Sequence, residues 1–235
     1  MRKKLLIHLG PPKTATTSFQ NWLKANQGFY TYLGINQPRK PNNNLVYNKF
    51  WLFINKKITI NELKNFVNEF ETEDTLILSE EMILINDWKS KVERLKELEK
   101  FYDLHLSYCY RSSKKVIPSY YAEIHSGLPE DLKNDYNLFL GDDRVNAYDL
   151  KCLSNNIDSN LNIFEFKKFT KGNLSLNKIF NLNFKYEVFN KKIMLIKENV
   201  KSKRSGNEYL VIDKHPSYPT KLKPYLKRLE KKMNI

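Results

Sequence analysis

Cysteine, glycine and long apolar runs are all scarce in this chain, and each shortage excludes a class of protein. Two cysteines among 235 residues exclude a disulfide scaffold and a cysteine-rich zinc module. The seven glycines form no glycine-rich linker. No apolar run approaches the length of about 18 residues that spans a bilayer. The apolar run at the start, Leu5–Leu9, is also too short for a signal peptide, so we expect a cytoplasmic protein.

Acidic residues are few in comparison with basic ones. The chain has 40 Lys and Arg against 26 Asp and Glu, which gives a formal net charge of +14. Residues 191–235 carry 13 basic and 4 acidic residues, so +9 of that charge lies in the last 45 residues. Such an excess indicates an anionic partner, for example a nucleotide, an acidic glycan, nucleic acid or a membrane surface.

Short apolar runs alternate with segments of helical spacing, and the length fits one domain over residues 1–235. The predicted strands are Leu5–Leu9, Thr75–Leu78, Leu104–Tyr110 and Leu161–Phe166. The predicted helices cover 16–26, 45–54, 60–70, 89–101, 113–125 and a basic segment at 222–233. Strands separated by helices predict an α/β fold, with a central parallel sheet that is flanked by helices.

The segment between the first strand and the first helix is typical of a phosphate site. It reads Gly10-Pro11-Pro12-Lys13-Thr14-Ala15-Thr16-Thr17. We expect Thr16 or Thr17 to cap the helix, and we expect the loop N–H groups and the helix dipole to bind phosphate or sulfate. Lys13 adds a positive charge, and the threonines add hydroxyl donors. The residue order is neither that of a Walker A loop nor that of the dinucleotide fingerprint.

The stretch from Ile7 to Gln20 resembles the 5′-phosphosulfate loop of sulfotransferases that use PAPS (3′-phosphoadenosine 5′-phosphosulfate), especially the bacterial and glycan-acting members. The resemblance implies a P-loop-like sulfotransferase architecture, with Lys13 at the oxygen that bridges the sulfate and the 5′-phosphate. The family usually has glycine at the position of Ala15, and we expect the methyl group there to require a negative φ. The residues implied to cradle the phosphosulfate are Pro12, Lys13, Thr14, Ala15, Thr16 and Thr17.

A second phosphate site is predicted where the third strand ends. Arg111 follows that strand, and Ser119 lies eight residues later on the next helix, so a guanidinium and a hydroxyl could bind one phosphate from two sides. The resemblance implies that this pair binds the 3′-phosphate of PAPS. Proline inside a helix removes a backbone hydrogen bond, so we expect the helix either to begin at Pro118 or to bend there. The basic segment that contains Lys203 and Arg204 is similar to a loop near the end of the family's sequences, which closes over the nucleotide.

The resemblance implies in-line transfer of a sulfuryl group from PAPS to a hydroxyl or amine, with a carbohydrate as the expected acceptor and no metal. Lys13 would neutralise charge on the leaving phosphate oxygen, and a base must accept the acceptor's proton. Glu81 is our first choice for this base, because the preceding strand delivers it to the carboxyl edge of the sheet. Glu80 and His125 are the alternatives. His8 lies in a strand and is expected in the core.

Two other classes of function fit parts of the sequence. A non-enzymatic polyanion-binding protein would use the basic C-terminal region, although no nucleic-acid-binding motif is recognisable and we expect no nucleic-acid partner. A P-loop kinase for small molecules would use the first loop, although the Gly-Lys pair of such kinases is missing. The polyanion-binding alternative leaves the two predicted phosphate sites unexplained, and the kinase alternative also lacks an evident carboxylate for Mg²⁺ beside the loop.

Overall fold

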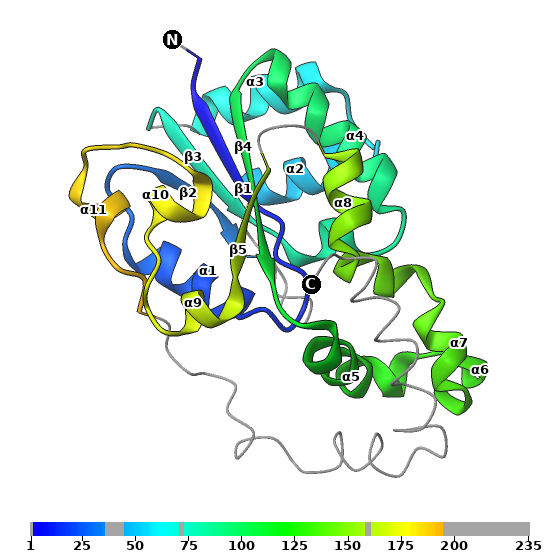
Figure 1. The fold of residues 1–235 in the computed structure, drawn as a ribbon. Coiled ribbons are helices and arrows are strands. Elements are labelled where there is room, and N and C mark those ends of the chain that lie inside the picture. The colour runs from blue at the N-terminus through cyan, green and yellow to red at the C-terminus, as the bar shows by residue number, and fades with distance from the viewer. Residues whose placement is uncertain (1, 36–44, 71–72, 158–160, 195–235) are drawn as a thin grey trace.

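The computed structural model describes residues 2–35, 45–70, 73–157 and 161–194. Its centre is a five-stranded parallel sheet with the strand order β2-β3-β1-β4-β5 (Figure 1). The predicted α/β fold with a central parallel sheet is therefore confirmed. Edge strand β2 was not predicted. The strands are β1 (Lys4–His8), β2 (Thr31–Ile35), β3 (Thr75–Ser79), β4 (Asp103–Tyr110) and β5 (Leu161–Glu165).

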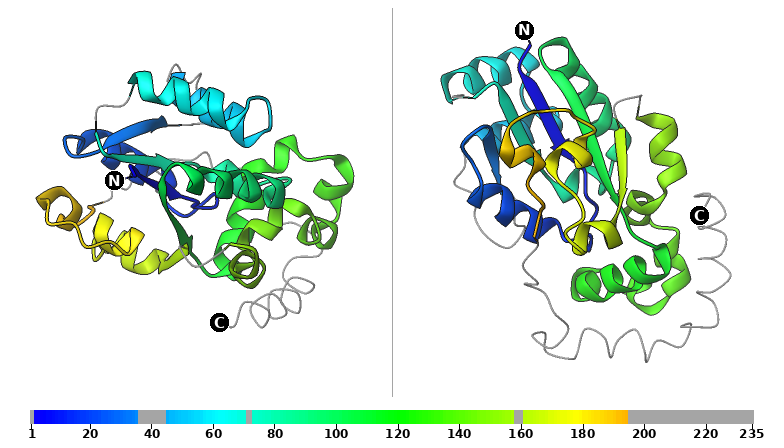
Figure 2. Two further views of the ribbon diagram at one scale, coloured as in Figure 1. Left: turned by 90° about the horizontal axis from the view of Figure 1, so that it is seen from above. Right: turned by 60° about the vertical axis from the view of Figure 1, so that its left-hand side comes forward.

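Different helices cover the two faces of the sheet (Figure 2). Successive side chains of a strand point to opposite faces, so Leu5 and Ile7 join one apolar cluster and Leu6 joins the other. Burial on both faces explains why the strands read as continuous apolar runs. The first face is covered by α2 (Leu45–Ile54), α3 (Ile60–Phe70), α4 (Trp88–Glu97) and α8 (Leu150–Asn156), and the second by α1 (Thr16–Ala25), α9 (Phe166–Thr170), α10 (Leu176–Phe180) and α11 (Glu187–Asn190).

The longer helices lie where the sequence predicts them, and α5 (Ser113–Ile124) continues through Pro118. The expectation that a helix could begin at Pro118 is therefore wrong. The predicted helix at 222–233 lies outside the described residues. Within the described ranges, no helix has the length and apolar character needed to cross a membrane. The short elements that complete the fold are η1 (Glu81–Leu84), η2 (Leu98–Lys100), η3 (His125–Gly127), α6 (Glu130–Asn134), α7 (Tyr136–Leu140) and η4 (Asp143–Tyr148).

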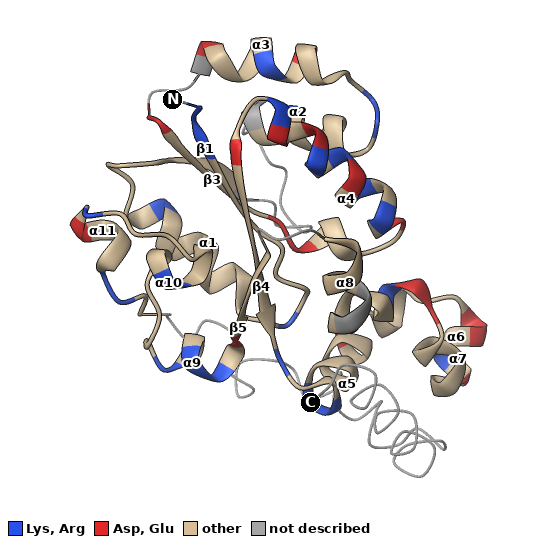
Figure 3. Ribbon diagram, turned by 45° about the horizontal axis from the view of Figure 1, so that its top comes forward, with Lys and Arg blue, Asp and Glu red and all other residues tan. Residues whose placement is uncertain are grey.

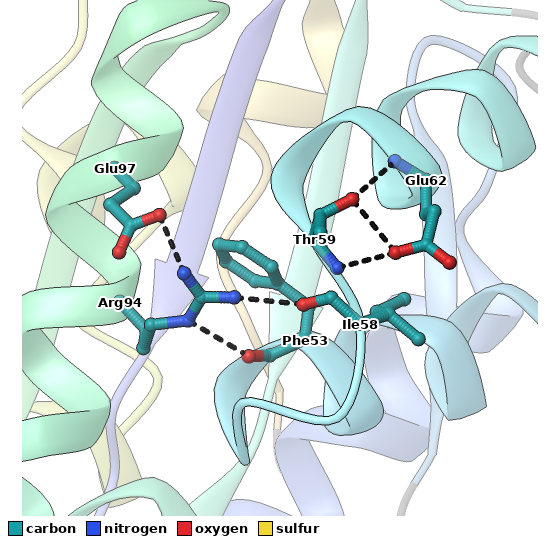
Figure 4. Close-up of polar contacts among 6 residues, drawn as sticks. All are labelled: Phe53, Ile58, Thr59, Glu62, Arg94 and Glu97. Carbon is teal, nitrogen blue, oxygen red and sulfur yellow. Dashed lines mark hydrogen bonds and ion pairs between the residues drawn. The ribbon is translucent and has the colours of Figure 1, made fainter.

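The turn between α2 and α3 is fixed from two directions (Figure 4). Thr59 and Glu62 form a capping box, in which the Thr59 N–H donates to Glu62 Oε2 (2.7 Å) and the Glu62 N–H donates to Thr59 Oγ1 (3.2 Å). From α4, Arg94 donates to the carbonyl oxygens of Phe53 (3.2 Å) and Ile58 (2.8 Å). These contacts join α2, α3 and α4 into one layer.

The strand order places the ends of β1 and β4 side by side at a switch point. The chain leaves β1 towards β2 on one side of the sheet, and it leaves β4 towards β5 on the other side. His8 at the end of β1 pairs with Ser79 of β3 and with Ser107 of β4. Open α/β sheets bind their ligands at the carboxyl edge beside such a switch point. The segments that follow β1, β3 and β4 therefore form the candidate site.

Candidate functional site

The loop between β1 and α1 turns at two residues that are not glycine. Lys13 has φ 69° and Ala15 has φ 65°, both in the left-handed region. The expectation that Ala15 keeps a negative φ is therefore wrong, because the residue adopts the conformation that favours glycine. Turns of this kind direct backbone N–H groups towards a shared concavity that binds anions.

The N-terminus of α1 has no side-chain cap. Ala15 is its N-cap residue and provides no capping side chain, and the first turn contains no acidic residue. Thr16 and Thr17 lie inside the helix, so the expectation that one of them caps it is wrong. Thr14 instead donates its hydroxyl to the carbonyl oxygen of Pro11 (2.6 Å), which stabilises the loop. The ten-residue helix thus presents backbone donors and the positive end of its dipole at the loop.

The fully buried side chain of His8 packs against this loop at Gly10, as predicted for a core residue. His8 packs against the rings of Phe19 and Phe164, and its Nδ1 lies 3.0 Å from Ser79 Oγ. A Cβ atom at Gly10 would lie 2.3 Å from Cε1 of the His8 ring, so the close approach of the loop requires glycine. Burial lowers the pKa of His8 to about 3, so the ring is neutral at physiological pH.

Arg111 joins the end of β4 to the loop. Its Nη1 donates to the carbonyl oxygen of Lys13 (2.6 Å), and its guanidinium lies over the ring of Phe166. From η4, the Tyr148 hydroxyl donates to the carbonyl oxygen of Pro12 (3.1 Å). The structure therefore brings Arg111 to the first predicted phosphate loop. Tyr148, which the sequence analysis did not identify, anchors the same loop.

Helix α5 brings an acidic residue, Glu123, to the loop. Glu123 lies one turn after Ser119, and residues four apart share a face of a helix. The Lys13 Nζ lies 3.4 Å from Glu123 Oε2, and the two side chains are only 11% and 21% exposed. Glu123 was not predicted from the sequence.

The two adjacent glutamates after β3 have different surroundings. Figure 3 shows acidic residues at the end of this strand and a basic residue after β4. Glu80 is fully buried and accepts hydrogen bonds from the Tyr47 hydroxyl (2.6 Å) and the Met82 N–H (2.8 Å). Glu81 is half-buried. Burial raises the pKa of Tyr120 and Tyr148, and the nearby charge of Glu81 raises both further. Glu81 begins η1, which packs against η4, whereas Glu80 stabilises the end of β3.

The remaining predicted residues lie elsewhere. His125 lies at the far end of α5, where its ring packs edge-on against Tyr121 at 5.2 Å. Lys203 and Arg204 fall outside the described residues. Across the part of the chain that the structure describes, no cluster of three or more His, Cys, Asp and Glu side chains could hold a metal ion.

Comparisons with known proteins add little to this geometry. No protein-family model matches the sequence, and no curated protein matches it. One solved structure with some likeness comes from a molecular and structural characterization of the PezAT chromosomal toxin–antitoxin system of Streptococcus pneumoniae. It is 14% identical, covers 100% of this chain and 86% of that chain, and has a TM-score of 0.33. A likeness at this level is too weak to assign a fold or a function.

Proposed function

We propose that this protein is a PAPS-dependent sulfotransferase that transfers a sulfuryl group to a hydroxyl or amine of a carbohydrate acceptor in the cytoplasm. The observation that carries the proposal is the hydrogen bond from Arg111 to the carbonyl oxygen of Lys13, which joins residues of the two predicted phosphate sites. These sites are 98 residues apart in the sequence and meet at the carboxyl edge of the sheet. A ligand with two separate anionic groups would suit them.

The residues at this edge fit the two anionic ends of PAPS. At the loop, the two left-handed residues and the start of α1, which has no side-chain cap, suit the phosphosulfate. At the end of β4, Arg111 has five N–H donors, so it can bond both the loop carbonyl and a phosphate oxygen. Ser119 lies on the α5 face that Glu123 directs towards Lys13, and its hydroxyl would supply the second contact to the 3′-phosphate.

The proposed mechanism depends on charge and position. PAPS would supply an activated sulfuryl group, whose bond to the acceptor oxygen forms as its bond to the phosphate oxygen breaks. Lys13 and the loop N–H groups would stabilise the negative charge that grows on the leaving oxygen. Glu81 would accept the proton of the acceptor at its carboxylate oxygen. Glu81 is half-buried, whereas Glu80 is fully buried and accepts two hydrogen bonds, and this difference supports the role for Glu81.

Ligand-dependent melting of the full chain separates the candidate functions. We expect PAP, the product nucleotide, to raise the melting temperature, because a ligand stabilises the folded state that it binds. Stabilisation by ATP with Mg²⁺ alone would instead favour a kinase, and no response to either nucleotide would favour a polyanion-binding protein. Transfer of labelled sulfate from PAPS to a panel of glycans then tests the reaction itself.

Arg111→Ala tests the proposed nucleotide site directly. Loss of a charge-assisted hydrogen bond should weaken PAP binding by roughly 1.5–3 kcal/mol, measured by calorimetric titration. Lys24→Ala is the matched control, because it removes one positive charge from the exposed end of α1. Equal PAP affinity in the wild type and Arg111→Ala would remove Arg111 from the site.

A further inference from the structure

The Lys13 side chain extends from the loop to α5. Its Nζ lies 3.4 Å from Glu123 Oε2, and both side chains are largely shielded from solvent. The main chain of Lys13 is held separately by Arg111. Both contacts come from the segment that includes β4 and α5, so the backbone and the ammonium of Lys13 are positioned by the same part of the chain. Glu123 therefore sets where the ammonium lies relative to the loop.

The charges of this pair have a consequence for any anion that enters the loop. A largely shielded ion pair is screened less by salt than a surface pair. The Glu123 carboxylate and a bound anion would both be attracted to the Lys13 ammonium, and they would repel each other. The carboxylate therefore opposes anion binding, while it keeps the ammonium between α5 and the loop.

We propose that Glu123 is a positioning residue for Lys13, which fixes the location of the ammonium and lowers the affinity of the loop for anions. The effect on anion binding needs only the contact between the loop and α5, whereas the effect on turnover rests on the function proposed above. Removal of the carboxylate should strengthen anion binding and slow turnover. A residue that only supported the structure would weaken both when it is removed.

The binding test uses inorganic pyrophosphate and PAP as probes in calorimetric titrations of the full chain. We expect Glu123→Gln to bind each probe about threefold more tightly, as for removal of a competing ion-pair partner. The gain should disappear in a Lys13→Ala background, because the competition acts on the ammonium. Glu130→Gln is the matched control, since it removes the carboxylate of the exposed Glu130–Lys133 pair (2.7 Å) on α6. Circular dichroism checks that each variant is folded.

Turnover provides the second readout. We expect Glu123→Gln to lower kcat about tenfold through misplacement of Lys13, with a lower KM for PAPS, and we expect Glu123→Asp to recover part of the rate. Unchanged or weaker pyrophosphate binding in folded Glu123→Gln overturns the inference. If pyrophosphate responds as expected but PAP binds no variant, the proposed function fails and the effect of Glu123 on anion binding stands.

Discussion

The strands on either side of β1 hold the loop between β1 and α1 by different means. On the β3 side the contacts are buried beneath the loop, where Ser79 contacts His8 through its hydroxyl and accepts a hydrogen bond from Gln20 (3.0 Å) at its carbonyl oxygen. On the β4 side, Arg111 and Tyr148 bond the carbonyl oxygens of the loop itself. Substitutions on the β3 side should therefore mainly lower the free energy of unfolding. Substitutions of Arg111 or Tyr148 on the β4 side should mainly lower the affinity for a ligand.

Glu81 tests whether the β3 side also contributes to the chemistry. Glu81→Gln keeps the shape of the side chain but removes its basicity, so we expect kcat to fall by about 10²–10⁴. PAP affinity should hardly change, because the carboxylate would face the acceptor. The measurement is sulfate transfer under saturating PAPS.

Glu80→Gln is the matched control for Glu81→Gln. Its carboxylate accepts two buried hydrogen bonds, so the variant should lose roughly 1–3 kcal/mol of unfolding free energy while the folded fraction stays active. An inactive Glu80→Gln beside an active Glu81→Gln would reverse the two assignments. If both variants were active, the base would lie elsewhere, and His125 would be tested next.

Lys13 lies in the loop between the two sides, and its removal separates binding from catalysis. We expect Lys13→Ala to fold and to keep part of its PAP affinity, since the Arg111 bond is made to the main chain. Turnover should fall at least about a hundredfold, as for the loss of one preorganised donor. A kcat within tenfold of the wild type would restrict Lys13 to a binding role.

His8, which contacts Ser79 of β3, should make the stability of the protein depend on pH. Its folded-state pKa of about 3 lies below the ordinary value of 6.5, so the unfolded chain binds a proton more readily than the folded protein. Stability should therefore fall as the pH falls from about 6.5 towards 3, and the loss from this group at pH 5 should be about 2 kcal/mol. Urea unfolding at pH 7 and pH 5 measures the effect. His8→Asn should show a smaller dependence on pH, and an equal dependence would contradict this origin.

The substitution Ala15→Gly has the smallest expected effect, and it tests the strain of the left-handed backbone in the loop. The left-handed conformation of Ala15 costs an L-residue more than it costs glycine, so the variant should gain roughly 0.5–1 kcal/mol in unfolding free energy. Ala25→Gly, at the end of α1, is the control and should have the opposite sign, because glycine has the lower helix propensity. Destabilisation by Ala15→Gly in urea unfolding would mean that the methyl group contributes packing that outweighs the strain.

The sequence was most informative where apolar periodicity was strong. The buried run at Leu5–Leu9 and the helical spacing of 60–70 correspond to β1 and α3 within about a residue. Strand β2 was missed because it is a five-residue edge strand that contains Gly34, and glycine weakens a strand pattern. The short helices α9, α10 and α11 were missed because four or five residues cannot display a helical period.

In the site, local sequence predicted the loop and the cations but not what they contact. Lys13 and Arg111 were identified from their positions beside strands. The conformation of Ala15 was wrongly expected, because a positive φ at a residue with a side chain depends on the surrounding structure. Glu123 and Tyr148 were missed because their partners lie more than 100 residues away and only the folded sheet brings them together.

These distant contacts have a consequence for synthesis of the protein. The loop leaves the ribosome before its partner does, because the Tyr148 hydroxyl that bonds Pro12 belongs to a residue 136 positions later. At typical elongation rates, the loop would wait on the order of ten seconds for that partner. Nascent chains that end before Tyr148 would lack this contact, so the loop should gain its full set of anchoring bonds only late in translation.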